Sequence, residues 1–314
     1  MRILVIGAGA IGGYFGGRLL EAGRDVTFLV RPRRAEQLAQ AGLSIRGASG
    51  DVDLPAPTVQ AGGLRQPFDL VLLSCKAFDL PDAMEQFAPA VGPDTAILPM
   101  LNGMQHLDML ERRFGAGAVL GGVAQISVTL DPRGRILHLG EIHSLVFGNR
   151  GGAPTERIQT IAATLAGAKF DARASESILQ EMWEKWVFIA TAAGITCLMR
   201  STVGDIVAAA AADLATALLD ECAAIARQQG FAPRPAAMQR NRAMLTVAGS
   251  GFTASMLRDV EQNACTEVDH VIGDLLRRGN NADPHALLRI ACAHLQAYEA
   301  RRTRTRAART DPLP

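Results

Sequence analysis

The sequence predicts an α/β fold in which an N-terminal doubly wound domain, residues 1–171, precedes an all-α C-terminal domain, residues 172–314. In the first half, short apolar runs alternate with helical patterns, which is typical of a parallel sheet covered by helices. In the second half, alanine-rich helical runs follow one another without a clear strand between them. A chain of 314 residues has room for two domains with substantial cores.

The first thirty residues predict a strand, a glycine-rich turn, a helix and a second strand. The apolar runs Arg2–Ile6 and Val26–Val30 are typical of buried parallel strands. The turn between the first strand and the helix consists of Gly7, Ala8, Gly9, Ala10, Ile11 and Gly12. In this pattern the first glycine permits a tight turn, the second lets the backbone approach a pyrophosphate, and the third lets helix and strand pack closely. We therefore expect a Rossmann-type dinucleotide site at the helix N-terminus; the alternative is a plain strand–turn–helix unit.

The residue at the end of the second strand selects the cofactor. An acidic side chain there would accept hydrogen bonds from the ribose 2′-hydroxyl of NAD, but this chain has Arg31, with Arg33 and Arg34 close behind. Guanidinium groups pair with a 2′-phosphate, whereas a carboxylate would repel it. The sequence therefore favours NADP(H) over NAD, with Arg31 at the 2′-phosphate. The alternative is a solvated arginine-rich turn.

Two more candidates follow predicted strands. Lys76 follows a strand over 69–73, and Asn102 follows one over 95–100. Because ligands bind at the carboxyl ends of parallel strands, one crevice could gather both with the glycine turn. Alternatively, Lys76 is a solvated loop residue and Asn102 only holds an Asn-Gly turn. The other elements expected in the first half are helices over 81–91 and 154–167, extended segments over 119–130 and 135–147 joined by a turn at 131–134, and a crossing segment over 169–175.

Lys185 interrupts the apolar face of a predicted helix in the second half. It shares one stripe with Met182 and Ile189, and both tryptophans of the chain flank it. Only three of the 32 basic residues are lysines, so a lysine here is a candidate for proton transfer, which a guanidinium cannot perform. Burial would lower its pKa and suit it to that task; alternatively, the side chain snorkels and keeps its ammonium group in water.

Glu267 is the matching acidic candidate. On a continuous helix over 255–275 it shares a stripe with Met256, Val260 and Val271. A buried carboxylate needs a cation or hydrogen-bond donors, and Lys185 is one candidate, with an arginine as the other. A Lys–Glu pair beside a nicotinamide would suit a carbonyl reductase, because the ammonium group stabilises and protonates the developing alkoxide. The helical runs expected in the second half are 176–193, 205–229, 235–248, 253–278 and 284–303, followed by a loose solvated tail over 301–314.

Composition excludes several classes of protein. A formal net charge of +1 argues against nucleic acid as the main partner, and no apolar run is long enough to cross a membrane. The five scattered cysteines lack a CxxC pair, which suits reduced thiols in a cytoplasm. The histidines show no metal-ligand spacing and the N-terminus no signal-peptide pattern, so we expect no metal and a cytoplasmic location. The sequence leaves monomer and homodimer open.

Six motifs together resemble the ketopantoate reductase (2-dehydropantoate 2-reductase) family along nearly the whole chain. They are the glycine turn, Cys75–Ala77, Asn102–Met104, Trp183–Lys185, Ser255–Asp259 and Thr266–Asp269. The resemblance implies a Rossmann domain and a helical domain with the active site in the cleft between them. It also implies NADPH-dependent reduction of 2-dehydropantoate to (R)-pantoate, a step toward pantothenate and coenzyme A.

The resemblance implies a role for each candidate. Lys185 matches the general acid and Glu267 the carboxylate that supports it. Ser255 matches a substrate-binding hydroxyl, Asn102 a residue near substrate and nicotinamide, and Lys76 a lysine near the cofactor. Arg31 matches the contact to the 2′-phosphate.

The chain departs from the family pattern along the helix that carries Lys185. Four and eight residues later, the best-studied members have substrate-binding asparagines, whereas this chain has Ile189 and Ala193. The loss of two hydrogen-bonding groups weakens recognition of a hydroxylated keto acid. Either other groups, such as Thr191 or Thr196, compensate, or the substrate is another small 2-oxo acid. A non-catalytic, NADPH-binding sensor is the third hypothesis.

Overall fold

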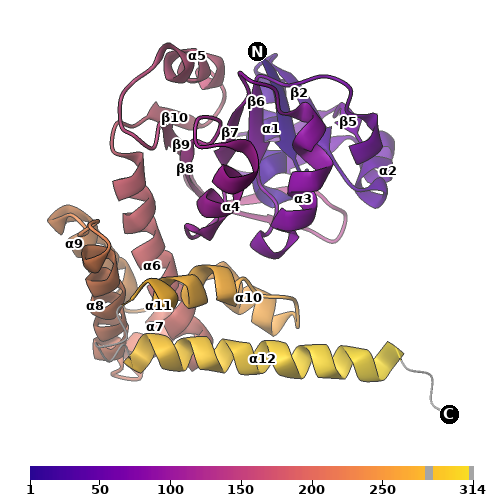
Figure 1. Ribbon diagram of the computed structural model, residues 1–314. Coiled ribbons are helices and arrows are strands. Elements are labelled where there is room, and N and C mark those ends of the chain that lie inside the picture. The colour runs from indigo at the N-terminus through magenta and orange to yellow at the C-terminus, as the bar shows by residue number, and fades with distance from the viewer. Residues whose placement is uncertain (280–285, 311–314) are drawn as a thin grey trace. The chain divides into compact units, whose positions relative to one another are not determined.

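The computed structural model describes residues 1–279 and 286–310 (Figure 1). By backbone packing the chain forms two units, each made of two segments: Met1–Leu101 with His106–Leu179, and Asn102–Gln105 with Gln180–Pro314. The main change of unit thus falls between Leu179 and Gln180, a few residues after the boundary expected from the sequence. The functional division into 1–171 and 172–314 stays a prediction.

A parallel sheet of five strands organises the first unit, in the order β5-β2-β1-β6-β7. The chain first adds β2 and β5 on one side of β1, and then returns to add β6 and β7 on the other side. The strand order therefore switches between β1 and β6, as in doubly wound folds. The strands β1, β6 and β7 are apolar and buried at nearly every position because helices cover the sheet. The predicted α/β doubly wound fold is confirmed. The strands are β1 (Arg2–Ile6), β2 (Asp25–Leu29), β5 (Thr58–Val59), β6 (Leu70–Leu73) and β7 (Ala96–Pro99).

A second sheet in the same unit is mixed, with the order β10-β9-β3-β4 and β8 paired to β9. The expected pair of extended segments with a turn between them is confirmed as β8 (Gly121–Leu130) and β9 (Ile136–Gly148). The sequence did not predict β3 (Leu43–Arg46) or β4 (Val52–Leu54), which are too short to show a clear pattern. The expected crossing segment contains a strand, β10 (Asp171–Ala174), which pairs in parallel with β9.

Helix α1 (Ala10–Glu21) packs against strands of both sheets. Its glycines allow this close approach: a Cβ atom at Gly13 would lie 2.6 Å from Ile136 of β9, and one at Gly16 would lie 2.6 Å from Phe28 of β2. Each glycine within a helix lowers the stability of that helix by about 1 kcal/mol relative to alanine, so close packing outweighs low helix propensity here. The position of α1 fixes the glycine turn at its N-terminus. The other helices of this part of the chain are α2 (Pro32–Ala41), α3 (Leu80–Phe87), α4 (Gln105–Phe114) and α5 (Glu156–Leu165).

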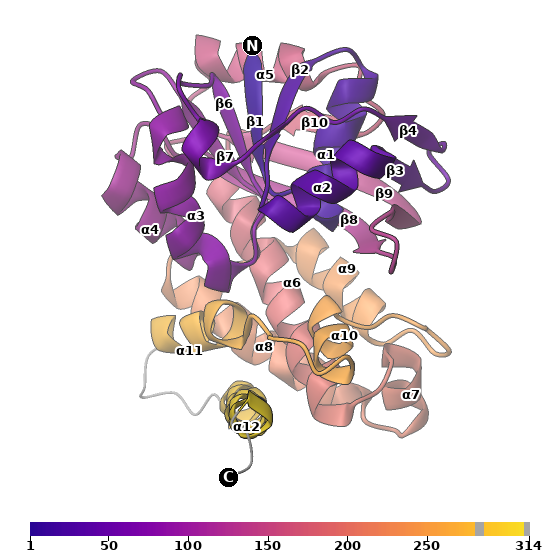
Figure 2. The ribbon, with the colours of Figure 1, turned by 90° about the vertical axis from the view of Figure 1, so that its right-hand side faces the viewer.

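The second unit consists of helices joined by loops, with no strand among its described residues (Figure 2), which confirms the all-α expectation. Helix α8 packs against α9, α11 and α12. The expected tail is partly wrong, because residues 301–310 continue α12 as a helix and residues 311–314 lie outside the described residues. The helices are α6 (Ile178–Met199), α7 (Val203–Ala208), α8 (Ala212–Gln228), α9 (Pro235–Leu245), α10 (Ser255–Glu261), α11 (Asp274–Arg278) and α12 (Ala286–Thr310).

The continuous helix expected over 255–275 is wrong. Helix α10 ends at Glu261, and Asn263 then takes a φ of +53°, a left-handed conformation that asparagine tolerates better than most residues. The amide and hydroxyl of Thr266 both donate to Glu299 Oε1, at 2.6 and 2.7 Å, and fix the break. A new helix starts at 268, with π-helical geometry over Asp269–Gly273. Glu267 therefore precedes a helix and shares no stripe with the residues of α10.

Candidate functional site

The first unit holds the glycine turn between β1 and α1. The Gly7 amide donates to the Leu29 carbonyl at 2.9 Å, and a φ of +89° makes glycine the favoured residue there. A Cβ atom at Gly12 would lie 2.3 Å from the Gly7 carbonyl oxygen and 2.1 Å from Ser74 Oγ, so the helix is in close contact with the turn and with the end of β6. A Cβ atom at Gly9 would meet nothing within 4 Å, which leaves the backbone open to a ligand. With no acidic residue in the first turn of α1, these features fit a dinucleotide pyrophosphate.

Arg31 and Lys76 follow β2 and β6, the two strands that flank β1. The Arg31 guanidinium donates to Asp79 at 2.8 Å, and Asp82 lies 4.0 Å away. Lys76 is exposed at the start of the short 3-10 helix Ala77–Asp79. The ion pair therefore brings Arg31 next to the segment that carries Lys76. The roles of both residues toward a cofactor stay predictions.

Lys185 lies in the second unit, in the middle of α6. Its side chain is half-buried, and the neighbouring Trp183 and Trp186 are buried with ring centroids 4.8 Å apart. Burial lowers the pKa of Lys185 from 10.5 to about 8, although the charge of Glu267 acts in the opposite direction. Partial burial thus shifts the pKa of Lys185 in the direction expected from the sequence. Such a group is mostly protonated at neutral pH and still gives up its proton readily.

Glu267, His270 and Asn102 belong to the same unit as Lys185. The Glu267 carbonyl accepts the amides of His270 and Val271, at 3.1 and 2.9 Å, where the new helix starts. Burial lowers the pKa of His270, while the charge of Glu267 and a hydrogen bond with the Asn102 backbone act in the opposite direction. Sequence reasoning missed His270, although its spacing of three residues from Glu267 was the signal that could have found it. Glu267 thus interacts electrostatically with both Lys185 and His270.

Glu184 anchors the helix that carries the lysine. Its buried carboxylate accepts two hydrogen bonds from the Arg234 guanidinium, both at 2.7 Å, and one from the Arg234 amide at 2.9 Å. Burial alone would raise the pKa of Glu184, but these bonds hold it below its usual range. On the other side of the lysine, Trp186 Nε1 donates to the Val271 carbonyl at 2.8 Å. Side chains on both sides of Lys185 therefore fix α6 in the second unit, a positioning role that the sequence did not indicate.

The groups expected to bind substrate differ in their surroundings. Ser255 is exposed at the start of α10, Ile189 is half-buried and Ala193 is buried. Thr191 and Thr196 are fully buried, and their hydroxyls donate to carbonyls four residues earlier in α6, at 2.8 and 2.6 Å. The alternative in which these threonines replace the missing substrate contacts is therefore not supported, because both hydroxyls lie in the core.

Residues 1–279 and 286–310 contain no group of three or more His, Cys, Asp or Glu placed to hold a metal ion. Within the same ranges, no helix is both long and apolar enough to cross a membrane. None of the five cysteines, all of which lie within the described ranges, forms a disulfide. Burial raises the pKa of Cys197 and Cys222 to about 12, so these thiols are poor nucleophiles.

Two family models match the chain and together cover most of it. The model described as "Ketopantoate reductase PanE/ApbA" matches residues 3–152. The model described as "Ketopantoate reductase PanE/ApbA C terminal" matches residues 177–299. The two matches follow the order of the two units.

Similar proteins come from several organisms. An uncharacterized oxidoreductase of Bacillus subtilis (strain 168) is 38% identical over 302 residues, which cover 96% of this chain and 99% of the relative. The crystal structure of 2-dehydropantoate 2-reductase from Geobacter metallireducens GS-15 is 29% identical, with a TM-score of 0.85 over 95% of this chain and 99% of that chain. A structure of D-mandelate dehydrogenase with NADH and anilino(oxo)acetate shares the fold, with a TM-score of 0.86 at 20% identity over 96% of this chain and 100% of that chain.

Proposed function

The chain belongs to the ketopantoate reductase family, and from this premise we propose that it reduces 2-dehydropantoate to (R)-pantoate with NADPH, on the route to pantothenate and coenzyme A. The observation that carries this proposal is the pKa of Lys185, which burial lowers to about 8 despite the charge of Glu267. A desolvated lysine beside a carboxylate suits proton transfer and has no evident use in a cofactor sensor. The oligomeric state and the cytoplasmic location stay predictions.

Reduction of the keto group requires a hydride at the carbonyl carbon and a proton at the carbonyl oxygen. A dinucleotide held at the glycine turn would supply the hydride from C4 of its nicotinamide. The Lys185 ammonium group donates a hydrogen bond to the keto oxygen, stabilises the negative charge that develops there, and transfers its proton to it. Because its pKa is about 8, Lys185 is a stronger acid than an exposed lysine with a pKa of 10.5. The Glu267 carboxylate favours the protonated form of Lys185 before the reaction.

The glycine turn would hold the dinucleotide. Gly9 offers open backbone at the N-terminus of α1, where free amides would bind the pyrophosphate. The preference for NADPH over NADH is proposed on the arginines that follow β2, which suit a 2′-phosphate better than a ribose hydroxyl. D-mandelate dehydrogenase, which shares the fold, binds NADH, so the preference needs a direct test.

A second candidate is the reduction of another small 2-oxo acid, one with fewer hydroxyl groups than ketopantoate. It is favoured by α6, where Ile189 and Ala193 are apolar and the hydroxyls of Thr191 and Thr196 are engaged in the core. A site with fewer hydrogen-bonding groups discriminates less against an apolar side chain on the substrate. The chemistry and the role of Lys185 are the same for both candidates.

Cofactor oxidation with a panel of acids tests these proposals. The loss of NADPH absorbance at about 340 nm is followed with ketopantoate and with plain 2-oxo acids of increasing side-chain size. A kcat/KM for ketopantoate that exceeds all others supports the first proposal. Preference for an unhydroxylated acid supports the second candidate, and NADPH binding without oxidation by any acid would leave the sensor hypothesis.

A further inference from the structure

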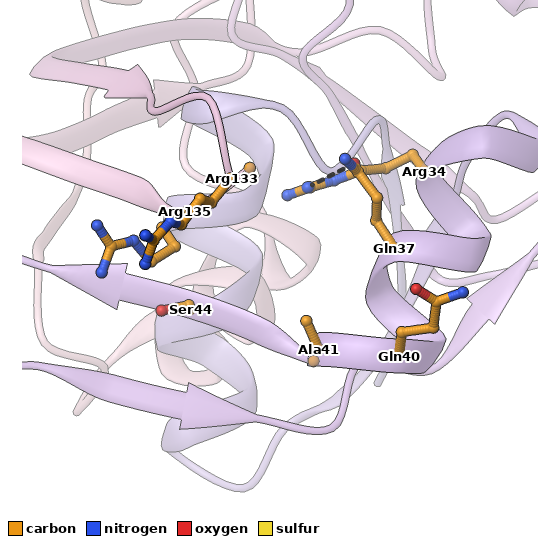
Figure 3. A pocket seen from close by; sticks show the side chains of 9 residues that line it. Arg34, Gln37, Gln40, Ala41, Ser44, Arg133 and Arg135 are labelled. Carbon is orange, nitrogen blue, oxygen red and sulfur yellow. Dashed lines mark hydrogen bonds between the residues drawn. The ribbon is translucent and has the colours of Figure 1, made fainter.

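Three arginines line a pocket of about 200 Å³ in the first unit (Figure 3). Arg34 comes from α2, whereas Arg133 and Arg135 come from the turn between β8 and β9 on the opposite side of the pocket. Among the described residues that line the pocket, none is acidic. The remaining lining residues are Gln37, Gln40, Ala41, Gly42, Ser44 and Gly134.

The Arg34 guanidinium is only partly satisfied. Its Nε donates to the carbonyl of Ala8 at 3.0 Å, and its Nη1 donates to Gln37 at 3.2 Å. Its Nη2 is shielded from solvent and has no hydrogen-bond partner in the described part of the chain. Burial lowers the pKa of Arg34, as expected for a cation that a carboxylate does not compensate. Because no carboxylate of the described residues compensates this guanidinium, it adds positive charge to the pocket that it lines, which favours an anion.

The turn that faces Arg34 is rigidly built. The Asp131 carboxylate accepts the amides of Arg133 and Arg135, at 2.9 and 2.8 Å, and Nε of Arg135 at 2.7 Å. Asp131 therefore compensates Arg135, and the uncompensated charge at the pocket comes from Arg34 and Arg133. Gly134, with a φ of +77°, lies against Arg34: a Cβ atom there would be 2.5 Å from Arg34 Nη1.

We propose that this pocket binds a phosphate monoester between Arg34 and Arg133. Paired guanidiniums match the geometry and charge of a phosphate, and the bond to Ala8 links Arg34 to the glycine turn. The phosphate has two chemical sources. It is either the 2′-phosphate of NADP, which rests on the proposed function, or a separate phosphorylated molecule. Arg31 is less suited to a phosphate, because Asp79 and Asp82 lie 2.8 and 4.0 Å from it.

Calorimetric titration of the full chain with inorganic phosphate, NADP+ and NAD+ tests the proposal. We expect Arg133→Gln, at an exposed position, to weaken phosphate binding about tenfold, in line with the loss of a charged hydrogen bond. Gly134→Ala should act in the same direction because its methyl group displaces Arg34. The control Arg65→Gln removes a charge that is also exposed but lies outside the pocket, and it should leave phosphate and NADP+ binding unchanged. Thermal unfolding confirms that each variant is folded.

The two sources give different results. If the pocket holds the 2′-phosphate, Arg133→Gln also weakens NADP+ about tenfold, leaves NAD+ unchanged, and phosphate competes with NADP+. If the ligand is separate, phosphate binds equally well with and without saturating NADP+, and the variant binds NADP+ as the unmodified chain does. The proposal is overturned if NADP+ affinity is unchanged in both variants and the phosphate titration gives either of two results. In the first, phosphate does not bind; in the second, it binds to both variants as it does to the unmodified chain. Failure of both dinucleotides to bind contradicts the proposed function, and the phosphate titration still tests the pocket.

Discussion

Replacing Lys185 with methionine tests whether the ammonium group is truly buried. Its pKa falls from 10.5 to about 8. At about 1.36 kcal/mol for each unit, holding the charged form in the folded protein costs up to about 3 kcal/mol. Because the folded-state pKa lies below the unfolded-state value, this cost is complete below about pH 8 and disappears as the pH rises to about 10.5. Lys185→Met should therefore raise the free energy of unfolding by about 1–3 kcal/mol at neutral pH, the lower figure allowing for solvent screening of a side chain that is only half-buried.

Urea unfolding at about pH 7 and about pH 10 measures the gain in the free energy of unfolding at neutral pH and its decline at high pH. Trp183 and Trp186, the two tryptophans of the chain, are buried on either side of position 185 and provide the fluorescence signal. The same variant should lose about 10²–10⁴-fold in turnover, the usual contribution of a general acid. Lys169→Met is the matched control: that lysine is exposed and paired with Glu21, so its loss should change stability by less than about 1 kcal/mol. If Lys185→Met does not raise the free energy of unfolding at neutral pH, the ammonium group reaches water. If the variant keeps near-normal turnover, Lys185 is not the general acid.

Three further predictions concern its surroundings. Glu267→Gln removes a charge that raises the lysine's pKa, so the pH at which the reduction rate begins to fall should move below about 8; a pH–rate profile with an unchanged or higher midpoint would contradict this. Gly12→Ala should lower the melting temperature strongly, because its Cβ would lie 2.1 Å from a side-chain oxygen, whereas Gly9→Ala should keep the melting temperature and weaken dinucleotide binding about tenfold in calorimetry. Equal melting temperatures for the two would refute the packing argument. Arg234→Ala leaves the Glu184 carboxylate buried without its main partner and should cost about 3 kcal/mol in urea unfolding, whereas a loss below about 1 kcal/mol would show that water replaces the guanidinium.

The sequence predicted those parts of the fold whose signals are local. The strands β1, β6 and β7 of the parallel sheet are apolar runs, whereas the two-residue strand β5 was not predicted. Gly7 and Gly12 mark the turn by spacing alone. The strand Asp171–Ala174 was missed because its residues are polar or small and mostly exposed, and its conformation depends on pairing with β9. Likewise, an arginine-rich stretch suggested a tail, yet residues 301–310 are helical as a continuation of α12.

Glu267, the acidic member of the candidate pair, was selected from the periodicity of a continuous helix that the structure does not contain. Periodicity placed Glu267 on one stripe with residues of α10, but Asn263 interrupts the helix. The charge of Glu267 nevertheless acts on the pKa of Lys185, which was one of the two cations expected to accompany it. His270 escaped notice because its one local signal, the spacing of three residues from Glu267, was not used, and its relation to Asn102 depends on contacts between segments far apart in the sequence.

The type of reaction and the choice of substrate depend on different kinds of residue. The proposed reaction type therefore follows from this chain more directly than the identity of the substrate does. Proton transfer depends on the pKa of a single group, and the burial of Lys185 determines that value whatever side chain the keto acid carries. Substrate selection depends on hydrogen-bonding groups that meet the substrate's hydroxyls. Helix α6 offers none at Ile189 or Ala193, and it uses the hydroxyls of Thr191 and Thr196 for its own backbone. If ketopantoate is nevertheless the preferred substrate, its hydroxyl must be recognised by groups outside α6, for which Ser255 and Asn102 are the first candidates to replace.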